Sequence, residues 1–148
     1  KSAIITGIGD KIQFVKHDLD DYHVLLINPI KEISTKNIFE KLKIEKEKRF
    51  KKEIKLTQIN LDFLKGKENH LESVAIKELL EINIILEFLR LKTSSLYSRM
   101  TGSGATCFSI FENKESLESA EKMIKLKFPL YWVMNTKLVN SINDINLV

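Results

Sequence analysis

Residues 97–111, YSRMTGSGATCFSIF, hold two short strand-like runs on either side of a loop with two glycines. Apart from Arg99, aromatic, apolar and hydroxyl side chains fill residues 97–100 and 106–111, a composition typical of β-strands. Glycine in the loop permits backbone angles that other residues disfavour. The stretch therefore predicts two neighbouring strands joined by a tight glycine loop.

Further elements are predicted downstream of this strand pair. Ser116 is the predicted N-cap of a helix that Pro129 ends, and residues 130–134 form the predicted last strand. Tyr131 and Trp132 in that strand are predicted to pack on the sheet. Four apolar residues at helical spacing mark the buried face of the helix: Leu117, Ala120, Ile124 and Phe128.

Upstream of the strand pair, residues 69–91 are predicted to form the longest helix, with Asn69 as N-cap and Glu72 completing a capping box. The apolar stripe of this helix consists of Leu71, Ala75, Leu79, Ile82, Leu86 and Leu89. A helix is also predicted from Ser34 or Thr35 to about Leu42, after a buried strand at residues 23–27.

The order strand, helices, strand, strand, helix, strand predicts an α+β fold, the ferredoxin-like split βαβ sandwich. Its helices are expected on one face of a four-stranded antiparallel sheet. Residues 1–18 form a separate predicted β-hairpin around Gly7 and Gly9. The predicted division is therefore a hairpin at 1–18 and the main domain at 19–148.

The composition is that of an ordinary globular protein. The 148 residues carry a formal net charge of +4, with 43% hydrophobic and 30% charged residues. No apolar run is long enough to span a membrane, so a membrane partner is not expected. A single cysteine, Cys107, predicts a reduced, cytoplasmic protein with no disulfide framework, and its place in a strand predicts a core residue.

The glycine loop is the segment most indicative of function. Successive backbone N–H groups of Gly102, Ser103 and Gly104 can form a concavity that suits an anion such as phosphate. The pattern is neither a Walker A loop nor a Rossmann fingerprint. A plain hairpin loop without a ligand is the alternative. His17, His23 and His70 lie far apart, so no metal site is predicted from their spacing.

Four segments together resemble the C-terminal half of the GHMP kinases. Residues 100–108, MTGSGATCF, match the third conserved motif of that family and are the most specific likeness. Supporting matches are the glycine hairpin at 3–10, Asn28-Pro29 with the helix that follows, and residues 69–72, NHLE, which are similar to an Asn-Asp-Leu-Glu helix start. The matches occur in family order from residue 1 to about residue 138.

The resemblance implies a reaction, cofactors and a site. Family members of this branch transfer the γ-phosphoryl group of ATP, with Mg²⁺, to the 2-hydroxyl of 4-diphosphocytidyl-2-C-methyl-D-erythritol in non-mevalonate isoprenoid biosynthesis. Gly102, Ser103 and Gly104 then lie near the transferred phosphate and the substrate. Phe39 takes the place of the aromatic ring that stacks on cytosine, and Thr35 that of a hydroxyl contacting the sugar alcohol.

Some parts of the family pattern have no counterpart here. The family's ATP-binding glycine loop, catalytic lysine and catalytic aspartate belong to its N-terminal half, so no catalytic residue is assigned in these 148 residues. That half is the expected partner, beside the small-molecule substrate. The resemblance also implies that the hairpin at 1–18 belongs to the end of the N-terminal kinase domain and that residues 19–148 are the GHMP kinase C-terminal domain. The loop after Pro29 also departs from the family: Ile30, Lys31 and Glu32 occupy it without the usual glycine.

Three alternatives stay open. The chain can belong to another GHMP kinase, such as a mevalonate or homoserine kinase, or be a non-catalytic relic. It can also be a basic RNA-binding module using the lysine-rich residues 41–53 with Phe50. Nucleic acid is not the expected partner, because RNA-binding sheets display aromatic rings on central strands, and Phe108 and Tyr131 are predicted to be buried.

Overall fold

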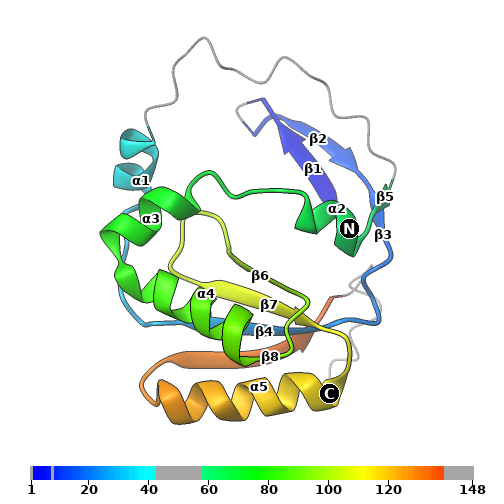
Figure 1. Cartoon of the computed structure of the whole chain (residues 1–148). Helices are drawn as coiled ribbons and strands as arrows, with labels where there is room; N and C mark the ends of the chain where they lie inside the picture. The colour runs from blue at the N-terminus through cyan, green and yellow to red at the C-terminus, as the bar shows by residue number, and fades with distance from the viewer. Residues whose placement is uncertain (1, 8, 43–57, 139–148) are drawn as a thin grey trace, which may run out of the picture.

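A four-stranded antiparallel sheet forms the centre of the protein. The computed structural model describes residues 2–7, 9–42 and 58–138. The strand order is β6 (Tyr97–Met100), β7 (Cys107–Phe111), β4 (His23–Asn28) and β8 (Trp132–Lys137). The two strands that are adjacent in sequence thus occupy one side of the sheet, and β4 separates them from β8 (Figure 1). This confirms the predicted α+β split βαβ fold.

Helices cover one face of this sheet. α4 (Leu80–Lys92) and α5 (Lys114–Lys127) run across it, as Figure 1 shows. Strand residues alternate between faces, so Leu25 and Ile27 of β4 join Cys107 of β7 beneath the helices. Fully buried helix residues complete this core: Ala75, Ile82, Ile85, Leu86, Leu89 and Ile124.

The opposite face of the sheet is covered by a second, smaller cluster. Its buried members are Leu19, Val24, Leu61 and Ile110. Leu61 begins the short helix α2 (Leu61–Lys65), which follows β5 (Gln58–Ile59). β5 pairs in parallel with β3 (Lys16–His17). These three elements were not predicted from the sequence, because two-residue strands and a one-turn helix carry no periodic signal.

The predicted single helix over residues 69–91 is wrong. It is divided into α3 (Glu72–Glu78) and α4 by Leu79, whose backbone is extended (φ −144°, ψ 96°). Ala75 before the break and Ile82 after it are both fully buried. The apolar stripe was therefore predicted correctly, but spacing along a chain does not show whether the helix axis changes direction.

Two predicted helix caps can be compared with the structure. Asn113, not Ser116, caps α5, and its Oδ1 accepts a hydrogen bond from the Ser116 N–H at 2.9 Å. Asparagine and serine are comparable N-caps, so composition alone does not choose between them. By contrast, α1 (Thr35–Lys41) is capped by Ser34, one of the two predicted candidates, whose hydroxyl accepts from the Asn37 N–H.

The N-terminal hairpin forms as predicted. β1 (Ala3–Thr6) pairs antiparallel with β2 (Lys11–Phe14) in a two-stranded sheet of its own. The predicted domain boundary at residue 18 follows β3 directly and stays a prediction. The hypothesis on the lysine-rich stretch 41–53 concerns positions almost wholly outside the described residues. None of the described helices is long and apolar enough to cross a membrane.

Candidate functional site

The glycine loop connects β6 to β7 and is closed by two internal hydrogen bonds. The Thr101 N–H donates to the Thr106 carbonyl at 2.8 Å, and the Gly104 N–H donates to the Thr101 carbonyl at 3.0 Å. Residues 101–104 therefore form a β-turn with Gly102 and Ser103 at its centre. Gly102 has φ +50°, a backbone angle that glycine adopts without strain.

Two amides of the turn keep their hydrogen atoms available. Within the described part of the chain, neither Gly102 N–H nor Ser103 N–H donates a hydrogen bond. Gly102 is exposed and Ser103 half-buried. The predicted anion concavity of three successive amides is therefore smaller in this structure, because Gly104 uses its N–H to close the turn. A pair of neighbouring amides can still donate to one anion oxygen.

Gly104 has a packing role that the sequence did not reveal. Its φ is +96°, and a Cβ built on it would lie 2.9 Å from Met100 Sδ and 3.4 Å from Ile82 Cδ1. The space beside Gly104 belongs to the core rather than to an open cleft. Its predicted contact with a ligand stays a prediction.

α1 brings two further predicted residues to the loop. Thr35 Oγ1 and Ser103 Oγ lie 2.8 Å apart and share a hydrogen bond. Phe39 lies one turn further along α1, so it shares a helix side with Thr35. Phe39 is 58% exposed, while the adjacent Ile38 is fully buried and attaches α1 to the core. Thr35, Ser103 and Phe39 thus belong to one surface region.

The side chains of Asn69 and Glu72 bind the backbone of the glycine loop and of the strand before it. From their spacing in the sequence, they were predicted only to cap a helix. Asn69 Nδ2 donates to the Met100 carbonyl at 3.0 Å and to the Gly102 carbonyl at 2.8 Å. Glu72 Oε2 accepts from the Met100 N–H at 3.0 Å. The predicted capping box is therefore wrong: Glu72 is directed into the protein instead of back to the chain before the helix.

Two arginines explain why the Glu72 carboxylate can be buried. Its Oε1 lies 3.1 Å from Arg99 Nη1 and 3.4 Å from Arg90 Nη2. A buried carboxylate is costly unless positive charge and hydrogen-bond donors surround it. The isolated Arg99, just before the third motif, and Arg90 in α4 were the only sequence signals of such a partner.

The loop following β4 completes the rim of the site. Asn28 Nδ2 donates to Thr106 Oγ1 at 2.8 Å, and Asn28 Oδ1 accepts from the Ile30 N–H at 2.7 Å. Lys31 pairs with Glu81, and this hydrogen bond raises the pKa of Lys31 and lowers that of Glu81. Side chains from both β4 and α4 thereby fix the segment that precedes α1.

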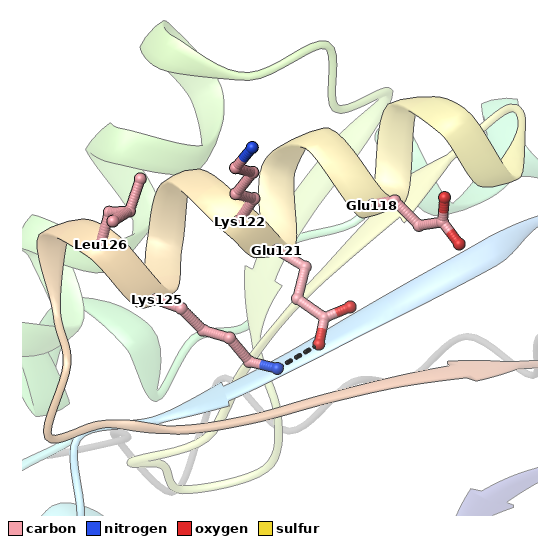
Figure 2. Close-up of a pocket in the computed structure, with 5 residues that line it drawn as sticks. All are labelled: Glu118, Glu121, Lys122, Lys125 and Leu126. Atoms are coloured by element: carbon pink, nitrogen blue, oxygen red, sulfur yellow. Dashed lines mark hydrogen bonds and ion pairs between the residues drawn. The ribbon is translucent and has the colours of Figure 1, made fainter.

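Other candidate groups are less suited to a functional site. Burial raises the pKa of the Cys107 thiol to about 12, which suits a core residue and not a nucleophile. In the ranges that the structure describes, no three His, Cys, Asp or Glu residues are grouped so as to hold a metal ion. An open pocket of about 370 Å³ lies on α5, lined by Glu118, Glu121, Lys122, Lys125 and Leu126 (Figure 2).

The pocket on α5 shares no residue with the predicted site. Figure 2 shows Glu121 directed toward Lys125, and the two charges pair at 2.6 Å. Glu121 also accepts from Asn135 Nδ2 at 2.7 Å. The polar groups of this pocket that carry the ion pair therefore bind one another, and the loop region between α1 and β6 is the stronger candidate site.

Comparison with known proteins defines the class. The family model described as "GHMP kinases C terminal" matches residues 38–130, more than half of the chain. The chain therefore belongs to the GHMP kinase family and corresponds to its C-terminal domain. The family resemblance deduced from the loop motif is confirmed.

The curated relatives point to one branch of this family. The "4-diphosphocytidyl-2-C-methyl-D-erythritol kinase" of Anaplasma phagocytophilum (strain HZ) is 32% identical over 145 residues, 95% of this chain and 48% of that protein. The kinase of the same name from Wolbachia pipientis wMel is 34% identical over 144 residues, 94% of this chain and 49% of that protein. The chain spans about half the length of these relatives.

Solved structures agree on the fold. A crystal structure of 4-(cytidine 5'-diphospho)-2C-methyl-D-erythritol kinase has a TM-score of 0.68 at 17% identity, covering 93% of this chain and 50% of that one. The homoserine kinase of Cytophaga hutchinsonii has a TM-score of 0.62 at 14% identity, covering 92% of this chain and 48% of that one. At these identities the likeness concerns the fold alone.

Proposed function

We propose that this chain forms the substrate-side half of a kinase that phosphorylates the 2-hydroxyl of 4-diphosphocytidyl-2-C-methyl-D-erythritol, in isoprenoid biosynthesis. The observation that carries the proposal is the hydrogen bond between Thr35 and Ser103, 68 residues apart. It joins the helix with the exposed Phe39 ring to the turn with two available amides. The names of the relatives agree with this substrate.

Each group of the site has a proposed task. Phe39 stacks on the cytosine ring, for which an exposed aromatic face is suited. The Gly102 and Ser103 amides donate to phosphate oxygens, and Gly104 keeps the turn closed beside them. Thr35 positions the sugar alcohol through its hydroxyl. Such a site contributes binding and orientation, which account for much of the catalysis in phosphoryl transfer.

The chemistry of transfer is assigned to a partner. We propose that ATP, its Mg²⁺ and the catalytic acid are held by a polypeptide equivalent to the other half of the relatives. The described residues do not fit a metal centre of their own, so the tasks assigned to them are binding and orientation alone. When bound, Mg²⁺ neutralises charge on the transferred phosphoryl group. The cytoplasmic location stays a prediction.

The exposed hairpin face supports such a partner. Ile5 and Ile12 are directly paired, and Phe14 lies on the same face two residues along β2. These three side chains are 60–68% exposed. An apolar face of this kind suits coverage by another polypeptide, and we place the partner half there.

Cytidine binding by the chain tests the proposed function. Phe39→Ala is expected to weaken binding of cytidine diphosphate by about 1–3 kcal/mol, the range for a stacked base. Isothermal titration measures this change. Phe14→Ala is the matched control, because Phe14 is 68% exposed on the hairpin away from the site, and its affinity is expected to equal that of the wild type.

Three outcomes contradict the proposal. Equal affinity of the Phe39→Ala variant and the wild type removes Phe39 from the site. Equal binding of cytidine diphosphate and inorganic diphosphate removes the cytidine specificity and favours another GHMP kinase. Turnover by the 148-residue chain alone would contradict the assignment of the catalytic acid to a partner.

A further inference from the structure

Asn69 controls the direction of the amide that we assign to the ligand. Its Nδ2 donates to the Gly102 carbonyl at 2.8 Å. In a planar trans peptide the C=O and the following N–H point in opposite directions. The Gly102–Ser103 peptide is trans, since the one cis bond among the described residues is Gly104–Ala105. Holding the Gly102 oxygen toward Asn69 therefore directs the Ser103 N–H away from it.

The Asn69 amide itself has little freedom. Its second Nδ2 proton donates to the Met100 carbonyl at 3.0 Å, and its Oδ1 accepts from the Leu71 N–H at 3.0 Å. Three hydrogen bonds fix both ends of the side-chain amide, and reversing the oxygen and nitrogen would break all of them. The side chain therefore has one stable orientation, and so does the peptide that it holds.

Glu72 fixes the Met100 backbone, to which Asn69 also binds. The carboxylate binds the Met100 N–H, while Asn69 binds the Met100 carbonyl. Both polar backbone groups of the last β6 residue are thus held by side chains from the start of α3. The carboxylate is kept in place by Arg90 and Arg99. The brace consists of Asn69, Glu72 and these two arginines.

We propose that Asn69 is a positioning residue that presents the Ser103 N–H to a phosphate oxygen of the substrate, with Glu72 fixing the end of β6. The identity of the ligand in this proposal rests on the proposed function, whereas the orientation of the Gly102–Ser103 peptide is independent of it. Asn69 touches neither ligand nor reacting atoms; it acts through the Gly102–Ser103 peptide. Preorganised amides lose no energy to reorientation when charge arrives.

The substitution Asn69→Asp removes the hydrogen bonds to the Met100 and Gly102 carbonyls and keeps the one to the Leu71 N–H at the helix start. Aspartate keeps the oxygen that accepts from Leu71 but loses both N–H donors, and it places a negative charge beside the Met100 and Gly102 carbonyls. Asn60→Asp is the matched control, because Asn60 Oδ1 caps α2 by accepting from the Phe63 N–H at 2.8 Å. Asparagine and aspartate cap helices equally well.

The orientation is measured first, without ligand. Residual dipolar couplings of the ¹⁵N-labelled 148-residue chain report the direction of each N–H bond. We expect the Ser103 coupling to change in Asn69→Asp, while β7 amides and the whole Asn60→Asp variant keep their wild-type couplings. An unchanged Ser103 coupling overturns the proposal. If Asn69→Asp does not fold, the scalar coupling across the Asn69 to Gly102 hydrogen bond in the wild type decides, and its absence overturns the proposal.

Titration with cytidine diphosphate then separates this inference from the proposed function. We expect the Ser103 amide of the wild type and of Asn60→Asp to shift on binding, and Asn69→Asp to bind roughly tenfold more weakly, the loss for one charged hydrogen bond. Wild-type affinity in Asn69→Asp overturns the positioning role alone. If the Ser103 amide resonance of the wild type does not shift at saturating cytidine diphosphate, the proposed phosphate contact is overturned. The orientation of the peptide is then tested by the dipolar couplings alone.

Discussion

The protein contains two Gly-x-Gly turns between antiparallel strands, and they differ in what surrounds them. The turn between β1 and β2 is closed by its own backbone, with the Gly9 N–H donating to the Thr6 carbonyl at 3.3 Å. The turn between β6 and β7 is held in addition by Asn69, Glu72, Asn28 and Thr35. A similar local sequence is thus built, in the second turn, into hydrogen bonds with side chains from β4, α1 and the start of α3.

The comparison shows where the specificity of a glycine loop originates. Glycine permits both turns, since Gly7, Gly9, Gly102 and Gly104 all have positive φ. The conformational freedom of glycine does not by itself determine the direction in which an amide N–H points. Among the described contacts, side-chain hydrogen bonds from β4, α1 and the start of α3 reach the second turn. A preorganised site is therefore built by partners distant in sequence, and their removal is the way to test it.

The largest effect is expected from valine at Gly104. Gly104 and Gly9 share φ +96°, but an added Cβ meets Met100 Sδ at 2.9 Å at Gly104 and nothing within 4 Å at Gly9. We expect Gly104→Val to lower the free energy of unfolding by about 4 kcal/mol, from backbone strain and overpacking together, and to abolish ligand binding. Urea denaturation followed by circular dichroism measures the loss of stability.

Gly9→Val is the control for strain without a clash. It is expected to cost about 1–2 kcal/mol, the penalty for a side chain in this backbone region. Equal losses in the two variants would show that the core packing at Gly104 is unimportant. The two turns would then differ less than their surroundings suggest.

The sheet could be predicted from the sequence because its strands and apolar stripes have clear periods. Residues 23–27 and 97–100 carry a local pattern, and the order of elements then leaves few topologies. The break at Leu79 could not be predicted, since both of its neighbours in the apolar stripe are buried in one core. The direction of a helix axis depends on packing that no local window contains.

A smaller loss of stability is expected from Glu72→Gln. The Glu72 side chain is 9% exposed and faces Arg90 and Arg99. Removing its charge leaves two guanidinium groups without their anion, which we expect to cost about 2–3 kcal/mol because both arginines retain some access to water. The unfolding midpoint in urea checks this value, and the variant is also expected to broaden the Met100 amide resonance.

Glu81→Gln provides the matched control. Glu81 also pairs with a cation, Lys31, but that pair lies at the surface. Surface ion pairs contribute little to stability, so no shift of the midpoint is expected. If the two variants destabilised the protein equally, the Glu72 carboxylate would be an ordinary surface partner, and the brace would not distinguish the second turn from the first.

The buried thiol next to the glycine loop makes stability depend on alkaline pH. Burial raises the pKa of Cys107 from 9.0 to about 12 in the folded state. Above pH 9 the unfolded chain loses the thiol proton and the folded chain keeps it. Stability therefore falls as the pH rises from 9 toward 12, by up to about 1.4 kcal/mol per pH unit.

Urea denaturation at about pH 8 and about pH 10, on the wild type and on Cys107→Ala, isolates the thiol from lysine and tyrosine titration. The wild type is expected to lose more stability than the variant between the two pH values. Equal losses, or rapid reaction of the folded thiol with a disulfide reagent near pH 9, would show that water reaches β7 as freely as it reaches the exposed hairpin.

The candidate site could be predicted only in part, for a physical reason. Thr35 and Phe39 were identified through family resemblance and Ser103 already from the glycine loop, and the structure brings the two hydroxyls together. Asn69 and Glu72 were assigned to a helix cap because their spacing fits one. The same side chains can bind their own helix or a neighbouring strand. Local spacing cannot decide between these partners, since the choice depends on tertiary contacts.

The smallest effect, opposite in sign, is expected at Ile30. This residue has φ +55° and is 69% exposed, in the loop where the family usually has glycine. A β-branched side chain is disfavoured at that angle, whereas asparagine tolerates it. Ile30→Asn is therefore expected to raise the free energy of unfolding by about 1 kcal/mol, measured by urea denaturation.

Ile12→Asn is the control from the hairpin. Ile12 is 60% exposed, but it lies in the regular strand β2, where asparagine is the poorer residue. The control is expected to be slightly less stable than the wild type. Opposite signs would show that the loop beside the braced turn carries backbone strain and the hairpin does not. A loss of stability in both variants would mean that Ile30 contributes packing worth more than the strain it imposes, and that the rim of the site is relaxed.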